Sequence, residues 1–326
     1  MKKLLLWCPV NYLNFGDMLV RRVMIKELDE MLKEWVITPS CSLSDIPDAD
    51  VILIGGGSLI GHPFLDYEFM DAIKDKPVFI YADIAYPDFL KSTENKARAR
   101  QILTMSRKTW LRFPESVEFA ESHKLQGDIK AGGDPIAMLD FTQYGNYEKK
   151  NNSVVTWNHY LQYNDDITSE FILKTFSLPQ PIQFLACEPQ DSAIWAYLKG
   201  NGVDASFDFD IYHMPNYISY ILGAKDFLSA RFHCSLLRFL NGKSAIVCTQ
   251  PNDYKKKFLC SYFNVPYSLL PNIKMETSMP DEKKIQEFRG MTSQTFKEIK
   301  IALDAFITLE VAPEVVPVVE NTINSL

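Results

Sequence analysis

Arg231 and His233 form the pattern with the clearest chemical meaning in this sequence. They stand two residues apart, directly after the short apolar run DFLSA at 226–230. A guanidinium presents a planar pair of donors that fits a carboxylate or a phosphate. An imidazole changes its protonation state near neutral pH, so His233 could donate a proton or contact an anion. The pair predicts an anion site with an acid–base group beside it; the alternative is a structural pair in which Arg231 binds a local acid.

Three consecutive glycines form a second candidate anion site. Gly55, Gly56 and Gly57 follow the apolar run VILI at 51–54 and precede Ser58. Backbone N–H groups at the start of a helix bind phosphate well when no Cβ blocks the approach. We therefore expect a strand that ends at a glycine loop, with Ser58 lining the same site. The alternative is that the glycines form only a tight strand-to-helix turn.

Several other polar residues directly follow apolar runs. Open parallel sheets bind ligands at the carboxyl ends of their strands, so these residues are expected to line one cleft. They are Asn14, Gly16 and Asp17 after the run at 4–7, Arg112 near the end of 108–113, His159 after 153–157, and Glu188 after 182–187. Asp17 is the first candidate for a general base because it stands where a helix begins, although a carboxylate there can instead serve only as a helix cap.

The apolar runs alternate with helical patterns in both halves of the chain. Strands are expected at 4–7, 51–54, 77–81, 108–113, 153–157, 182–187, 226–230 and 244–248. Helices are expected at 16–34, 92–106, 166–176, 190–200, 214–223, 232–241 and 253–263. Such alternation predicts parallel sheets that are covered by helices on both faces.

A polar stretch, YGNYEKKNN at 144–152, separates the two halves. The sequence therefore predicts an α/β protein with two Rossmann-like domains, residues 1–145 and 146–326, that face a central cleft. The helical pattern after about residue 281 predicts terminal helices that pack back on the first domain. A chain of 326 residues, of which 47% are hydrophobic, is long enough to fill two cores.

Composition argues against several classes of function. The net charge of −7 argues against a nucleic-acid partner, because binding nucleic acid requires a basic surface. No apolar stretch approaches the roughly 18 residues of a membrane-spanning helix, so no transmembrane segment is expected. The cysteines show neither a CxxC pair nor metal-ligand spacing, so we expect thiols in a cytoplasmic protein and no metal site.

An ordered set of short motifs resembles the polysaccharide pyruvyl transferase family. The set comprises Asn14-Phe15-Gly16-Asp17, Ile54-Gly55-Gly56-Gly57-Ser58-Leu59, Arg112 with Ser116, Gly133-Asp134-Pro135, Ser229-Ala230-Arg231-Phe232-His233 and the segment NDYKKKFLCSYFNVP at 252–266. The motifs follow the family's order and cover about residues 3–270.

The resemblance implies a GT-B-like fold with the active site between two domains. It implies an enzyme that transfers a pyruvyl group from phosphoenolpyruvate to two hydroxyls of a sugar and closes a cyclic ketal. The acceptor would be a cell-surface polysaccharide, such as an exopolysaccharide, or its lipid-linked oligosaccharide precursor. That acceptor suits a cytoplasmic protein associated peripherally with the inner face of the membrane. Phosphoenolpyruvate is the donor substrate, and no further cofactor is expected.

The family's Arg-x-His motif is associated with the phosphoenolpyruvate site, which implies that Arg231 and His233 lie there. His233 is then the candidate acid or phosphate contact, and Asp17 the candidate base. Two alternatives remain open. A GT-B glycosyltransferase with a nucleotide-sugar donor would use a carboxylate such as Glu188 or Asp253 to bind ribose. A non-catalytic, glycan-binding relative would retain the fold without the chemistry.

Overall fold

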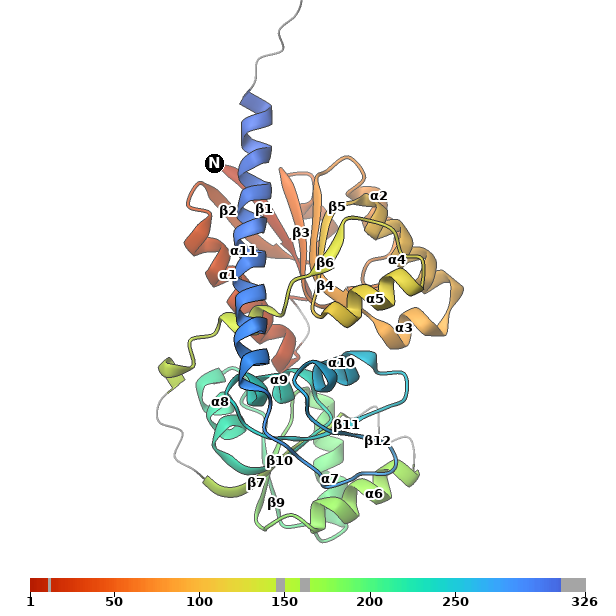
Figure 1. Ribbon diagram of the computed structural model, residues 1–326, viewed down its shortest axis with the longest axis vertical. Coiled ribbons are helices and arrows are strands. Elements are labelled where there is room, and N and C mark those ends of the chain that lie inside the picture. Colours follow the sequence, from red (N-terminus) through yellow and green to blue (C-terminus); the bar gives the residue numbers. More distant parts are fainter. Residues whose placement is uncertain (11–12, 145–149, 159–164, 312–326) are drawn as a thin grey trace, which may run out of the picture.

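Two six-stranded β-sheets form the framework of the protein (Figure 1). The computed structural model describes residues 1–10, 13–144, 150–158 and 165–311. Within these ranges, neighbouring strands of both sheets pair in parallel. The expected α/β architecture with two Rossmann-like units is confirmed.

The first sheet has the strand order β2-β1-β3-β4-β5-β6. Its strands are β1 (Lys2–Trp7), β2 (Trp35–Ser40), β3 (Val51–Ile60), β4 (Val78–Ile84), β5 (Ser106–Leu111) and β6 (Ile129–Ala131). Its helices are α1 (Phe15–Met31), α2 (Tyr67–Ala72), α3 (Tyr86–Lys91), α4 (Thr93–Met105) and α5 (Pro114–Ser122). Every residue of the central strand β4 is buried, as expected for a parallel strand covered on both faces.

The second sheet has the strand order β12-β11-β10-β7-β8-β9. Its strands are β7 (Lys150–Thr156), β8 (Ile182–Leu185), β9 (Ala205–Asp208), β10 (Ala224–Ser229), β11 (Ile246–Thr249) and β12 (Tyr267–Leu269). Its helices are α6 (Asp165–Phe176), α7 (Ser192–Gly200), α8 (Met214–Gly223), α9 (Phe232–Leu240) and α10 (Tyr254–Tyr262). The sequence analysis missed β2, β6, β9 and β12, which are the edge strands of the two sheets.

The last described helix, α11 (Glu282–Val311), leaves the second sheet and runs along the first (Figure 1). Trp110 of β5 donates a hydrogen bond to Glu298 (Nε1 to Oε2, 2.9 Å). Phe296 packs edge-on against Tyr81 of β4, with ring centroids 5.7 Å apart. The chain therefore uses its C-terminal helix as an apolar cover for the first sheet.

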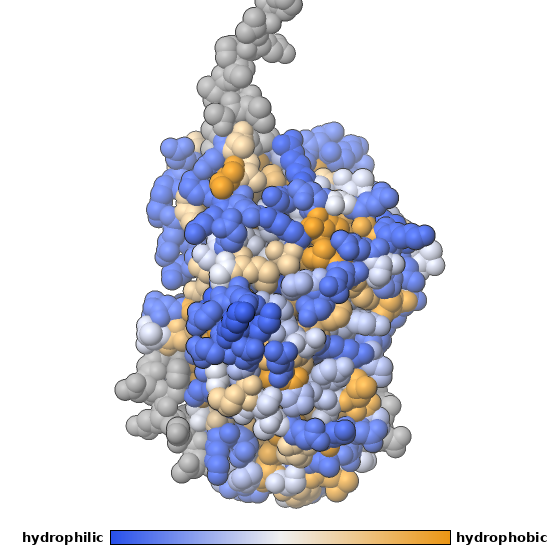
Figure 2. Space-filling view, viewed as in Figure 1, coloured by the Kyte–Doolittle hydropathy of each residue, from blue (hydrophilic) through white to orange (hydrophobic). Residues whose placement is uncertain are grey.

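Hydrophilic side chains cover most of the face shown in Figure 2, and apolar ones form scattered patches on it. Among the helices of the described ranges, none combines the length and the apolar character that crossing a membrane requires.

The triple glycine belongs to a strand and not to a helix-initiating loop. Strand β3 continues through the glycines to Ile60, and its register with β4 shifts between Gly55 and Ser58. The next helix, α2, is six residues long and begins at Tyr67. The expectation of a helix N-terminus directly after the glycines is therefore wrong, because an irregularity in the strand uses them instead.

Gly55 has a packing role that explains why it carries no side chain. A Cβ at this position would lie 2.4 Å from Cε of Met24 in α1. Gly56 has φ +88°, a backbone conformation that residues with a Cβ rarely adopt. These glycines let α1 lie close against the irregular strand.

We predict that Gly55→Ala destabilises the protein by about 1–3 kcal/mol, the usual cost of overpacking a core. The control is Gly290→Ala in α11, where an added Cβ meets no atom within 4 Å. A helical glycine replaced by alanine stabilises by roughly 0.4–1 kcal/mol, so the control should be more stable than the wild type. Denaturant unfolding measures both values. An unchanged stability for Gly55→Ala would contradict this packing role.

Candidate active site

The carboxyl ends of both sheets meet at a cleft of about 660 Å³, which we call the interdomain cleft. Nine of the predicted site residues line it: Asn14, Gly16, Asp17, Gly57, Ser58, Arg112, Glu188, Arg231 and His233. Gly55 and Gly56 are not among the lining residues, since they pack beneath α1. The remaining candidate, His159, lies outside the described residues.

Asn14 caps helix α1 and ties the two domains together. Its Oδ1 accepts hydrogen bonds from the backbone of Gly16 (2.9 Å) and Asp17 (3.2 Å), which satisfies two free donors of the first turn. Its Nδ2 donates to Glu188 of the second domain. The start of α1, and with it Asp17, is thereby fixed against the opposite wall of the cleft.

Gly16 permits a close approach between the two domains. A Cβ at this position would lie 1.9 Å from Nδ1 of His233. No rotation of a short side chain removes such an overlap with a ring. The absence of a side chain at Gly16 therefore allows the His233 ring to pack against the start of α1. This packing places Gly16 at the cleft.

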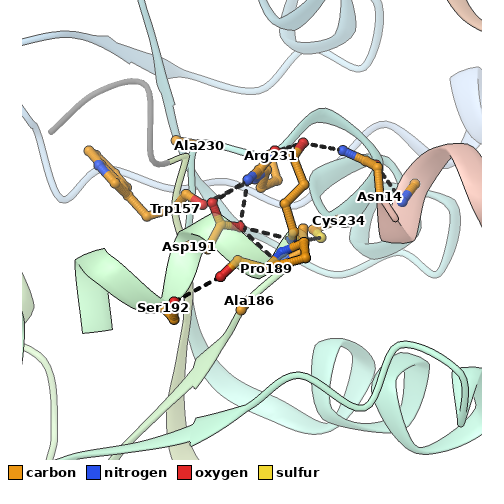
Figure 3. Close-up of polar contacts among 12 residues, drawn as sticks. Asn14, Trp157, Ala186, Pro189, Asp191, Ser192, Ala230, Arg231 and Cys234 are labelled. Atoms are coloured by element: carbon orange, nitrogen blue, oxygen red, sulfur yellow. Dashed lines mark hydrogen bonds and ion pairs between the residues drawn. The ribbon is translucent and has the colours of Figure 1, made fainter. Parts of the chain in front are cut away.

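Arg231 is engaged entirely within the second domain (Figure 3). Its Nε donates to the Trp157 carbonyl (3.0 Å), its Nη1 to Glu188 (2.8 Å), and its Nη2 to both carboxylate oxygens of Asp191. The side chain is only 10% exposed. The expectation of a guanidinium fork open to a ligand is therefore corrected, because Asp191 occupies that fork.

Arg112 reaches across the cleft from the end of β5. Its Nε pairs with Asp134 (2.6 Å), its Nη1 donates to Ser58 (3.2 Å), and its Nη2 lies 3.2 Å from Nε2 of His233. The guanidinium also lies over the ring of Phe232, 4.8 Å from its centroid. Arg112 thus links the first sheet directly to the start of α9.

His233 is neutral in this arrangement. A guanidinium can only donate, so Nε2 of His233 accepts from Arg112 and the ring proton lies on Nδ1. Burial, reinforced by the positive charges of Arg112, Lys255 and Arg231, holds the pKa of His233 well below its usual value. The structure therefore favours His233 as a neutral hydrogen-bonding contact over the role of imidazolium acid.

Helix α10 contributes two lysines with different environments. Lys256 is buried and donates to the Ala230 carbonyl (2.8 Å) while pairing with Asp253 (3.0 Å). Within the described part of the chain, Lys255 has neither a hydrogen bond nor an ion pair, although it lines the same cleft. Burial, with help from Arg112 and Lys256, lowers the pKa of Lys255. Lys255 is therefore the cation that remains available to a ligand.

Asp17 is the acidic counterpart of Lys255. A Cβ at Gly57 would lie 3.3 Å from Oδ1 of Asp17, so the carboxylate lies against the strand β3 irregularity. Burial raises the pKa of Asp17 to about 6, although Lys255 and Arg112 act in the opposite direction. This carboxyl can therefore exchange a proton near neutral pH.

The sequence analysis did not single out Asp134, Asp191, Lys255 or Lys256 as site residues. Asp134 and the two lysines lie in segments that it quoted for the family resemblance, so that signal was present. The only sequence signal for Asp191 was its position three residues after Glu188. Within the described ranges, no group of three or more His, Cys, Asp or Glu side chains is arranged to hold a metal ion.

Three solved structures share this arrangement of two domains over most of their length. UDP-N-acetylglucosamine 2-epimerase from Rickettsia bellii has a TM-score of 0.61 and 11% identity, over 95% of this chain and 99% of that one. The S. aureus MnaA–UDP structure has a TM-score of 0.61 and 8% identity, over 95% and 98%. UDP-GlcNAc 2-epimerase from Neisseria meningitidis, bound to UDP-GlcNAc, has a TM-score of 0.54 and 10% identity, over 94% and 100%. At these identities the likeness establishes the GT-B-like fold alone.

No curated protein matches the sequence. The profile of the polysaccharide pyruvyl transferases matches residues 14–251, from the Asn14 cap of α1 to the turn before α10. The matched segment includes Asp17, Arg112, Glu188, Arg231 and His233. With most of its length matched and its cleft built from these residues, the chain belongs to the polysaccharide pyruvyl transferase family.

Proposed function

We propose that this protein transfers a pyruvyl group from phosphoenolpyruvate to two hydroxyls of a sugar and closes a cyclic ketal. Membership of the family supports the transferase chemistry. The observation that carries the proposal is Lys255, a cation without a protein partner among the described residues that faces a cleft shared by both domains. An anionic donor would supply the missing partner.

The donor carries a phosphate and a carboxylate, which require two sets of contacts. Lys255 provides a point charge for one of them. Ser58 and Arg112 hydrogen-bond to one another beside His233 in the same cleft and supply hydrogen-bond donors. In this proposal Arg231 acts through Glu188, which it holds against Asn14 at the start of α1.

The reaction needs stabilisation of positive charge at C2 of the donor as phosphate leaves. Glu188 provides negative charge along the cleft, and Lys255 stabilises the departing phosphate. A volume of about 660 Å³ is within the usual range for small-molecule sites, so a sugar ring can bind beside the donor. The half-buried side chain of Phe64 and the side chain of Leu59 provide an apolar wall against which the sugar ring can pack.

The acceptor in this proposal is a cell-surface polysaccharide or its lipid-linked precursor, and the reaction takes place in the cytoplasm or at the inner face of the membrane. The nucleotide-sugar alternative receives less support from the cleft. Glu188 is held by Asn14 and Arg231, and Asp253 by Lys256, so both carboxylates considered for ribose binding are already engaged.

The direct test is incubation with phosphoenolpyruvate and a panel of nitrophenyl glycosides. We expect release of inorganic phosphate together with a product whose mass has increased by one pyruvyl ketal. Parallel reactions with UDP-sugars test the glycosyltransferase alternative. Glycosyl transfer without any phosphate release from phosphoenolpyruvate would contradict the proposed function, and binding of glycans without turnover would support the non-catalytic alternative.

We predict that Lys255→Met weakens phosphoenolpyruvate binding by about tenfold to a hundredfold. This is the loss expected for one hydrogen bond to a charged group, about 1.5–3 kcal/mol. Titration calorimetry measures the dissociation constant. Lys257→Met is the matched control, because Lys257 donates to the Pro251 carbonyl and does not line the cleft. Equal donor affinities for the two variants would rule out Lys255 as the anion contact.

For Arg231→Lys we predict a loss of stability as well as activity. Lysine cannot satisfy Trp157, Glu188 and Asp191 together, so buried acceptors lose partners at a cost of about 1–3 kcal/mol. At roughly 2–4 °C per kcal/mol, the melting temperature should fall by several degrees. Arg100→Lys, an exposed position on α4, serves as the control. A normal melting temperature with weakened donor binding would instead indicate that Arg231 contacts the ligand.

A further inference from the structure

The interdomain cleft is not positively charged, although its proposed donor is an anion. Among the described residues, four cationic side chains and five carboxylates line the cleft or pair with the arginines that line it. The cations are Arg112, Arg231, Lys255 and Lys256, and the carboxylates are Asp17, Asp134, Glu188, Asp191 and Asp253. With His233 neutral, these groups leave a net negative charge when all carboxyls are ionised.

Ion pairing assigns almost all of these charges to one another. Asp134 holds Arg112, and Asp253 holds Lys256. Glu188 and Asp191 together hold Arg231. The residues left over are Lys255 on α10 and Asp17 on α1, whose charges act on each other across the cleft.

Phosphoenolpyruvate brings roughly two to three negative charges near neutral pH, from its phosphate and its carboxylate. Placing them beside ionised Asp17 in a partly dehydrated cleft is strongly unfavourable, because like charges repel most where water is excluded. Positive charge must therefore enter with the ligand, as a proton or as a metal cation.

Asp17 is the group best placed to accept a proton. The charged groups that face it are Lys255 from α10, Arg112 from the end of β5, and Glu188 and Arg231 from the second domain. Arg112, Glu188 and Arg231 are already engaged with other residues. An anion bound at Lys255 would neutralise the main cation that stabilises ionised Asp17. Burial already raises the pKa of Asp17 to about 6, so a further rise moves it into the physiological range.

His233 is the competing proton acceptor in the cleft. Its Nε2 already accepts from Arg112, so protonation there would break that bond and place an imidazolium beside the guanidinium. Asp134 lies 3.9 Å from Nε2, but it already pairs with Arg112. The Nδ1 of His233 carries the proton that Nε2 lacks and lies against Gly16. Neither nitrogen takes up a proton without rearranging the contact between the domains.

We propose that phosphoenolpyruvate binds together with one proton taken up by Asp17, and that the resulting carboxylic acid delivers this proton to C3 of the donor. The inference rests on the proposed function. It makes Asp17 an acid in the first step and a base in the second, and Asp17 lines the same cleft as Lys255.

The proposed proton transfers balance. The C2–C3 double-bond electron pair takes the proton from Asp17 and forms the methyl group, which leaves C2 electron-deficient. The first sugar hydroxyl attacks C2, and its proton returns to the Asp17 carboxylate. The C2–O bond to phosphate then breaks, the second hydroxyl forms the second C–O bond, and its proton leaves with the phosphate.

The test is calorimetric titration of phosphoenolpyruvate in EDTA, in buffers of different ionisation enthalpy. At pH 7 to 8.5 the phosphate is largely ionised, because its second pKa is near 6, so proton uptake reports on the protein. We expect the wild type to take up close to one proton at the lower end of this range. The dissociation constant should fall by up to about tenfold per unit of decreasing pH.

In Asp17→Asn we expect no proton uptake and a dissociation constant that is flat with pH. At pH 8 this variant should bind phosphoenolpyruvate at least as tightly as the wild type, because a repelling charge is gone, while phosphate release is abolished. A residue that only positions the donor would give weaker binding instead. Asp29→Asn, an exposed position on the same helix, should behave as the wild type in every measurement.

Three outcomes would overturn the inference. The first is proton uptake that persists in Asp17→Asn. The second is proton uptake that disappears in His233→Gln. The third is a wild type that takes up no proton and binds the donor only when Mg²⁺ replaces EDTA. Each leaves the proposed function in place, because phosphoenolpyruvate still binds. Absence of donor binding to the wild type under all conditions would instead overturn the proposed function, and the proton coupling with it.

Discussion

A pair of buried, charge-assisted links between the two domains determines the shape of the cleft. Arg112 at the end of β5 holds Asp134 and donates to His233 at the start of α9. Arg231 holds Glu188, which accepts from Asn14 at the start of α1. Displacing either domain would break the Arg112–His233 and Asn14–Glu188 hydrogen bonds, and buried polar groups that lose their partners are costly. These two links hold the start of α1 against Glu188 and the end of β5 against the start of α9.

Pairing also decides which groups remain free for chemistry. Carboxylates of the protein pair with the guanidinium groups of Arg112 and Arg231. The two guanidinium groups therefore act as rigid donors and positioning groups more than as counter-ions for a ligand. Lys255 and Asp17 are left to respond to a bound anion. The division has a physical basis, because the groups buried most tightly must be neutralised by the fold itself, while the groups on the cleft surface can be neutralised by substrate and proton.

The strands in the interior of each sheet were predictable, and the edge strands were not. Strand β3 begins with an apolar run and is buried along nearly its whole length, and the second half of β10, Phe227–Ser229, is also buried. In strand β2 only the first and last residues, Trp35 and Ser40, are buried, and strand β6 has no fully buried residue, so neither strand is a buried apolar run. Edge positions face solvent and tolerate polar residues, which removes the signal on which the sequence analysis relied.

By itself, the sequence determined that two parallel sheets meet at their carboxyl ends and which polar residues stand there, because a strand's direction and its last residue are local properties of the chain. Only the tertiary structure decided what those residues do. Arg231 and Lys255 are both cations beside the cleft, yet Asp191 engages the first and no described residue pairs with the second. Charge pairing and burial depend on residues far apart in sequence, and the pKa of Asp17 depends on four of them.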